Sequence, residues 1–259
     1  MAARLNNILA SPHATLAPAV RSVTFMNALS PVQIRIPSTG RVQVKTLLEI
    51  VPRITQLHHI RSLALSDLPF NILSAFPKVE RLTLVGIPAG LALLRLASHL
   101  PRLTHLMLKR VHAIPYRACA LPSTAPVSKG AELRSLAVSG SSIGFLGWMG
   151  VLAPRIKALD IADFSYDELS HLTAYLHIVR STLESLKLSF ISGTDARGFS
   201  WDELAQALDL RTRVVVCVDF QDVEEEDDVD AQFLRTQFAE WDKRGMLEVR
   251  PVDDSQDTD

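Results

Sequence analysis

One nine-residue phrase recurs along this chain, and it constrains the fold more than any other feature of the sequence. The phrase is an apolar residue, any two residues, Leu, any residue, Leu, any two residues and a second apolar residue. Close copies begin at Ile60, Val79, Leu103, Ile156 and Leu183, and looser copies begin at Val20 and Leu133. A repeated unit of this length cannot bury its apolar face alone, so neighbouring units must stack into one continuous core.

The fourth residue of each copy, which is the first Leu of the phrase, gives the spacing of the repeat. These positions are Val23, Leu63, Leu82, Leu106, Leu136, Leu159, Leu186, Val216 and Leu247, the last two belonging to degraded copies. A unit of roughly 20–30 residues with this phrase is the leucine-rich-repeat signature. We therefore expect an α/β fold, a leucine-rich-repeat solenoid of about eight or nine irregular repeats, with an open curved parallel sheet and helices on its convex side.

Helical spacing lies between several of the expected strands. Apolar stripes are formed by Val44, Leu47, Leu48, Val51 and Ile54, and by Leu169, Leu172, Leu176 and Val179. Capping boxes that start at Ser165 and Ser200 predict two helix N-termini. A last helix is predicted from about Val229 to Lys243, with Gly245 ending it in the left-handed conformation. Residues 111–129 contain three prolines and are predicted to be a surface loop.

Charge divides the chain into a basic body and an acidic end. Residues 1–218 hold 23 Lys and Arg against 13 Asp and Glu, whereas residues 219–259 hold 4 against 15. We expect a single leucine-rich-repeat domain over residues 1–250, with an acidic loop at 222–230 and a disordered acidic tail at 251–259. The acidic end is either a solvated surface or a segment that folds against the basic body and screens it.

Several classes of function find no support in the sequence. The two cysteines are isolated and the N-terminus lacks the apolar core of a signal peptide, so we expect a cytoplasmic or nuclear protein without membrane spans. The eight histidines have no metal-ligand spacing, and no glycine-rich phosphate loop is present, so neither a metal nor a cofactor is expected. Basic residues are spread singly without interleaved aromatics, which argues against nucleic-acid binding.

The segment Gly140-Ser-Ser-Ile-Gly144 matches the G-x-S-x-G pattern of a hydrolase nucleophile elbow. Asp160 or Asp163, and then His171 or His177, follow Ser142 in the chain order of a Ser-Asp-His triad. The strand before this segment is a repeat strand, however, and no HGGG-type oxyanion motif precedes it. Catalysis by Ser142 is therefore the alternative hypothesis, and a non-enzymatic protein is the main one.

Strand positions that point away from the expected core form the candidate binding surface, because a solenoid binds partners on its exposed strand face. The central row is expected to be Thr24, Ala64, Thr83, Met107, Ala137, Asp160, Lys187, Cys217 and Glu248. The candidate partner-binding residues on this concave face are Arg81, Thr83, His105, Met107, Lys109, Asp160 and Lys187. Arg and Met are enriched in interface cores, which favours a protein partner.

The N-terminal segment "LNNILASPHATLAPAVRSVTF" resembles a recurrent segment of fungal, basidiomycete-type F-box proteins with divergent leucine-rich repeats. The matching residues are Ser11, Pro12, Thr15, Ala17, Pro18, Arg21, Val23 and Phe25. Trp241 and the final "GMLEV" strand from Gly245 also resemble that family. The resemblance covers nearly the whole chain, but the helical F-box that should precede the repeats is absent.

The resemblance implies a role in selecting targets for a cullin-type ubiquitin ligase. In that family the F-box docks on the ligase adaptor while the repeats hold the target, so an adaptor is a partner here only if an F-box is supplied upstream. We expect a non-enzymatic protein-protein recognition module whose protein target the sequence does not identify. A paralogue without any partner is the remaining alternative.

Overall fold

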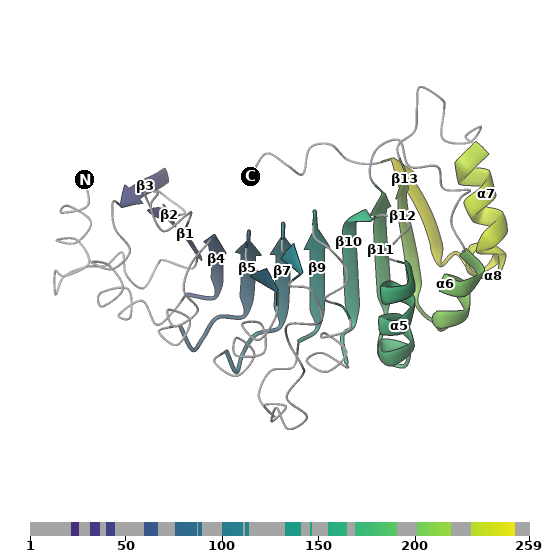
Figure 1. Ribbon diagram of the computed structural model, residues 1–259, viewed down its shortest axis with the longest axis horizontal. Coiled ribbons are helices and arrows are strands. Elements are labelled where there is room, and N and C mark those ends of the chain that lie inside the picture. Colours follow the sequence, from purple (N-terminus) through teal and green to yellow (C-terminus); the bar gives the residue numbers. More distant parts are fainter. Residues whose placement is uncertain are drawn as a thin grey trace. The chain divides into compact units, whose positions relative to one another are not determined.

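The computed structural model describes residues 22–25, 32–36, 40–44, 60–66, 76–86, 88–89, 100–110, 112–113, 133–140, 146, 155–164, 169–190, 201–218 and 229–251. The chain forms two compact units, residues 1–133 and residues 134–259. Figure 1 labels most of the strands and helices of both units. Most of the acidic loop, the acidic tail after Pro251, and Ser142, Ser165 and Ser200 lie outside the described residues. Pro251, expected to begin the disordered tail, is instead the last residue of a strand.

The first unit is built on parallel repeat strands. They are β1 (Ser22–Phe25), β4 (Ser62–Ser66), β5 (Arg81–Val85) and β7 (His105–Lys109), which pair in that order. Val23, Leu63, Leu82 and Leu106 are direct neighbours across these strands. Leu63, Leu82, Leu84, Leu106 and Leu108 are buried. The predicted register is therefore confirmed in this unit.

An antiparallel hairpin, which the recurring phrase did not predict, pairs with the outer side of β1. Its strands are β2 (Val32–Ile36) and β3 (Gly40–Val44), and β2 pairs with β1. Val44, expected to open a helix, is instead the last residue of β3, because apolar residues alternate along both arms of the hairpin. The rest of that expected helix lies outside the described residues.

A second, two-stranded sheet joins β6 (Pro88–Ala89) to β8 (His112–Ala113) in parallel. The residues of β8 belong to the 111–129 segment that was predicted to be a loop. That prediction is wrong for these two residues, and the remainder of the segment lies outside the described residues.

The described residues of the second unit include five parallel strands. They are β9 (Ser135–Ser139), β10 (Ala158–Phe164), β11 (Ser185–Phe190), β12 (Arg213–Val218) and β13 (Leu247–Pro251), paired in chain order. Leu136, Leu159 and Leu186 share one buried row, as predicted. On β9, β10 and β11 alternate side chains are buried and the side chains between them are partly exposed, whereas Val214 to Cys217 of β12 are all buried.

The register of β12 differs from the prediction by two residues. Leu186 is paired with Val214, not with Val216, and Val214 is paired with Leu247. The central outward row therefore continues from Lys187 to Val215 and Glu248, and Cys217 lies one row farther along. The strand sequence "RVVVCV" explains the error, because a shift of two residues keeps every side chain on its face and puts valine at the core positions in either register.

Helices cover the apolar side of the five-stranded sheet in the second unit. They are α5 (Leu169–Val179), α6 (Trp201–Ala207), α7 (Val229–Gln237) and α8 (Ala239–Lys243). The stripe predicted for α5 is buried at Leu172, Leu176 and Val179. Because the opposite strand face stays partly exposed at Ser185, Lys187 and Ser189, these helices must pack on the leucine-bearing face.

The helix predicted from Val229 to Lys243 is broken at Phe238, which separates α7 from α8. Apolar spacing continues through the break, so the pattern gave no sign of it. The predicted end is confirmed: Gly245 has φ +64°. The amide of Met246 donates to the carbonyl of Trp241 at 2.8 Å and that of Gly245 to Asp242 at 2.9 Å, which is a Schellman motif.

Aromatic rings close the C-terminal end of the core. The rings of Phe190 and Trp201 meet edge to face with centroids 5.5 Å apart, and Trp201 meets Phe238 in the same way at 5.4 Å. Phe238 in turn contacts Trp241 at 5.7 Å. Such pairs stabilise a core beyond the area they bury. Phe238, the residue at the helix break, is thus one of the two inner rings of this cluster.

Backbone hydrogen bonds join successive repeats just before each strand begins. The carbonyl of Arg61 accepts the amides of Glu80 at 2.9 Å and Arg81 at 2.8 Å. The carbonyl of Glu80 accepts the next two amides, those of Thr104 and His105, in the same way. In the second unit the carbonyls of Arg134 and Lys157 each accept two amides from the following repeat. This forked bond joins the repeats of β4 and β5, of β5 and β7, of β9 and β10, and of β10 and β11.

A residue in the left-handed conformation follows each of β5, β7 and β9, and Asp163 has the same conformation near the end of β10. Gly86, Arg110, Gly140 and Asp163 stand directly after equivalent strand positions and have φ values of 68°, 53°, 56° and 59°. Only glycine adopts this conformation without strain, and aspartate tolerates it better than most residues. Gly140, the first residue of the G-x-S-x-G match, is therefore part of the repeat geometry.

Candidate protein-binding face

Strand alternation places five of the predicted site residues on one surface of the first unit. In β5 and β7 the leucines are buried, and the intervening side chains point to the opposite face of the sheet. Arg81 is paired with His105, Thr83 with Met107, and Val85 with Lys109. We call Arg81, Thr83, His105, Met107 and Lys109 the basic strand face.

The basic strand face carries cations without carboxylates. Arg81 and His105 are exposed, and Met107 is 38% exposed, which is unusual for a large apolar side chain. The side chains of Arg81 and Lys109 form no hydrogen bond or ion pair within the described part of the chain. The imidazole Nδ1 of His105 lies 2.8 Å from the hydroxyl of Thr104. This surface combines free donors with one accessible thioether.

On the open face of the second unit, by contrast, the charged side chains form ion pairs with one another. Lys187 Nζ lies 3.8 Å from Asp160 Oδ2, and Arg213 Nη2 lies 2.6 Å from Glu248 Oε2. Glu248 also forms an ion pair with Arg250. The charges on these strands therefore satisfy one another across neighbouring repeats, and the positions between them are mostly Ser and Ala.

The pKa values of this face follow from its packing. Burial raises the pKa of the Asp160 carboxyl, and the Coulombic attraction of Lys187 opposes that rise in part. Hydrogen bonds from Arg250 and then Arg213 lower the pKa of Glu248.

The outward side chains of β12 are largely covered. Val215 and Cys217 are only 9% and 5% exposed although they belong to outward rows.

The predicted site residues thus fall into two groups. Arg81, Thr83, His105, Met107 and Lys109 lie together in the first unit, and the pair formed by Asp160 and Lys187 lies in the second. Sequence reasoning missed the cations beside Glu248. Arg213 and Arg250 could have been found by extending the outward row along β12 and β13, but only with the correct register.

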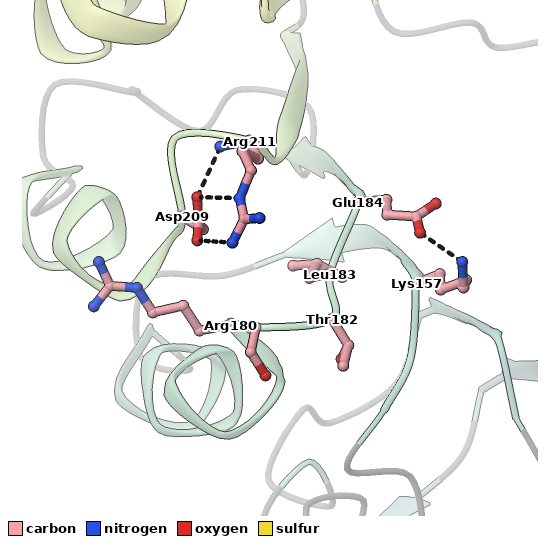
Figure 2. A pocket seen from close by; sticks show the side chains of 8 residues that line it. Lys157, Arg180, Thr182, Leu183, Glu184, Asp209 and Arg211 are labelled. Atoms are coloured by element: carbon pink, nitrogen blue, oxygen red, sulfur yellow. Dashed lines mark hydrogen bonds and ion pairs between the residues drawn. The ribbon is translucent and has the colours of Figure 1, made fainter.

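The second unit also has a surface depression of about 350 Å³ at the N-terminal edge of its strands. Figure 2 shows its lining side chains, which come from the turns after α5 and α6 and from the start of β10. The lining residues are Lys157, Arg180, Ser181, Thr182, Leu183, Glu184, Asp209 and Arg211. The sequence pattern singled out none of them as site residues.

Ion pairs account for both carboxylates of this depression. Lys157 Nζ lies 2.6 Å from Glu184 Oε1, and the guanidinium of Arg211 binds Asp209 through two hydrogen bonds of 3.2 and 3.0 Å. The side-chain bonds from Arg211 lower the pKa of Asp209 to about 2. Helices α5 and α6 end at this edge, where their C-terminal carbonyls favour cations. Arg180 directly follows α5, where a cation is favoured, and Arg211 is held by Asp209.

The candidate metal ligands and triad residues lie only partly within the described residues. Those residues contain no group of three or more His, Cys, Asp and Glu placed to hold a metal ion. His171 and His177 are both exposed on α5. Asp163, one of the candidate triad acids, accepts a hydrogen bond from the hydroxyl of Ser139 at 3.1 Å. No helix among the residues the structure describes is long and apolar enough to span a membrane.

Comparison with known proteins identifies a fold but not a family. No family model matches the chain, and no curated protein matches it. Among solved structures, the chain is similar to the leucine-rich repeat-containing protein LegL7 from Legionella pneumophila, with a TM-score of 0.52 and 14% identity. That likeness covers 95% of this chain and 85% of LegL7. A protein from Bacteroides fragilis gives a TM-score of 0.45 at 13% identity, covering 97% of this chain and 70% of the other.

The likeness to LegL7 agrees with the parallel, in-register repeat strands described above. The chain is an α/β leucine-rich-repeat solenoid protein, which confirms the fold class predicted from the recurring phrase. At this level of identity the likeness concerns the fold alone.

Proposed function

We propose that this chain is a non-enzymatic module that recognises a protein through its open strand faces. The observation that carries the proposal is the basic strand face, where free cations and an exposed methionine stand on rigid strands. The strand backbones of a repeat scaffold are already ordered before binding, and such faces are where solenoids bind partners. The ion pair of Asp160 and Lys187 lies on a second candidate contact surface.

The wider role that we propose is target selection for ubiquitylation in the cytoplasm or nucleus. The support is the resemblance of the residues around Ser11 and Trp241 to fungal F-box proteins with leucine-rich repeats. The repeats would hold the target, and an F-box supplied upstream would hold the ligase adaptor. Neither nucleic acid nor a membrane is a proposed partner.

Capture from a fungal lysate tests the binding face. Arg81→Glu with Lys109→Glu should lose the proteins that the wild-type chain retains, because both charges reverse on the proposed contact surface. The matched control is Lys78→Glu with Arg102→Glu, since both residues are exposed in turns of the same unit and lie off the strand face. Loss of partners with the control pair, and retention with the strand pair, would place binding elsewhere.

A fusion tests the wider role separately. With an F-box joined to its N-terminus, the chain should bring retained proteins to a reconstituted cullin ligase and support their ubiquitylation. The Arg81 and Lys109 double variant of the same fusion should still bind the adaptor and should leave those proteins unmodified. Adaptor binding with no modification of any retained protein would contradict target selection.

A further inference from the structure

The two open faces differ in one respect that bears on the identity of the partner. On the second unit, Asp160 and Glu248 each have a cation from a neighbouring strand within ion-pair distance. On the basic strand face the described strand positions offer cations and no carboxylate. A surface with free donors and no carboxylates to neutralise them is complementary to an anionic partner.

The spacing of the cations limits the shape of that partner. Lys109 lies one strand across from Arg81 and four residues farther along, because it is paired with Val85. With strands about 4.8 Å apart and a rise of about 3.3 Å per residue, the two Cα positions are roughly 14 Å apart. Met107 lies between them, beside Thr83.

An extended protein segment reproduces this spacing. Its side chains at i, i+2 and i+4 point to one face, and the first and last of them are about 13 Å apart. A carboxylate at i would therefore reach Arg81 while one at i+4 reaches Lys109. An apolar side chain at i+2 would lie on Met107, whose thioether adapts to different partners.

We propose that the basic strand face binds an extended acidic protein segment of the pattern acidic-x-apolar-x-acidic. This inference rests on the proposed function and narrows its partner to one chemical class. Arg81 supplies a planar pair of donors for one carboxylate and Lys109 a point charge for the other. Thr83 is small, which leaves Met107 accessible from the side of β5.

Fluorescence anisotropy with the full chain tests the pattern. The probe is a fluorescein-labelled peptide with the core Glu-Ser-Leu-Ser-Glu between Gly-Ser flanks. The matched peptide has the core Ser-Glu-Glu-Ser-Leu, which keeps the composition and net charge but breaks the i, i+2, i+4 face. We expect the first peptide to bind about tenfold more tightly than the second, and its affinity to fall with added salt because the contacts are charged.

Protein variants complete the test. Arg81→Glu with Lys109→Glu should weaken binding of the first peptide by about tenfold or more, and Lys78→Glu with Arg102→Glu should change it by less than about twofold. Circular dichroism melting of both variants shows whether the fold is kept. Met107→Ser, which keeps both charges, should also weaken the first peptide and leave the second unchanged.

Four results would overturn the inference. These are equal binding of the two peptides, tighter binding of a single-stranded oligonucleotide than of the first peptide, tighter binding of a peptide that spans residues 222–230, and no peptide binding at all. The third result would make the occupant the acidic segment of this chain itself.

If peptides fail to bind while lysate capture still depends on Arg81 and Lys109, the proposed function stands and this inference fails. If capture is also independent of those residues, both fail.

Discussion

Replacing Leu186 with alanine removes three carbon atoms from the centre of the second unit. The side chain is fully buried, and it lies between Leu159 on one neighbouring strand and Val214 on the other. Loss of transfer free energy alone is about 2.4 kcal/mol, at about 0.8 kcal/mol for each carbon. Strands on both sides hold the surrounding backbone in place, so the cavity should persist and bring the total to about 3–5 kcal/mol.

Urea denaturation followed by circular dichroism measures this loss, and the same strand supplies the control. Ser185 precedes Leu186 and lies on the opposite, open face, so Ser185→Ala should change the free energy of unfolding by less than about 0.5 kcal/mol. A shift of one residue in register would exchange the two faces. Equal destabilisation by the two substitutions, or a larger effect of Ser185→Ala, would refute the assignment of the core row.

Three further predictions concern titration and reactivity in the second unit. In a Cys119→Ser background, the thiol of Cys217 should react with an alkylating reagent only after denaturant is added, because it is 5% exposed. The pKa of Asp209 is lowered to about 2 in the folded state, so its charged form stabilises the fold at any pH above the pKa of the same group in the unfolded chain. The difference in free energy of unfolding between wild type and Asp209→Asn, measured in urea, should therefore shrink as pH falls from 4 to 2. Partial burial raises the pKa of the Asp160 carboxyl, so its ionisation weakens the fold as pH increases. Asp160→Asn should gain urea resistance relative to wild type between pH 4 and pH 7, and a constant difference would contradict the partial desolvation of this carboxyl.

The core rows could be predicted because leucine alternates with other residues along most repeat strands. Where that alternation fails, so does the prediction: the valine run of β12 fits two registers equally well. The hairpin of β2 and β3 was missed because it carries valine and isoleucine in place of the repeat leucines. The break at Phe238 has no sequence signal, since an apolar residue is expected there whether the helix continues or ends.

The candidate site was predictable to the same extent. Membership of the outward rows follows from the period of two, so the sequence alone is enough to place Arg81, Met107 and Lys109 on one face. The ion pairs between strands could not be predicted, because the contact between Arg213 and Glu248 depends on a register and on rotamers that the pattern does not specify. The sequence alone therefore does not show that the charges pair with one another on the open face of the second unit, whereas Arg81 and Lys109 on the basic strand face have no such pairs among the described residues.

The forked backbone bonds that join one repeat to the next have a consequence for how such a chain can change. Because a carbonyl and two amides make each joint, the side chains at those positions contribute little to it, and residues as different as Arg61, Glu80 and Lys157 occupy the same place. A duplicated repeat would find its attachment point in any neighbour, whatever its own sequence. Copies could therefore be gained or exchanged while their outward residues drift, which makes the joint the constant part of the architecture and the binding specificity the replaceable part.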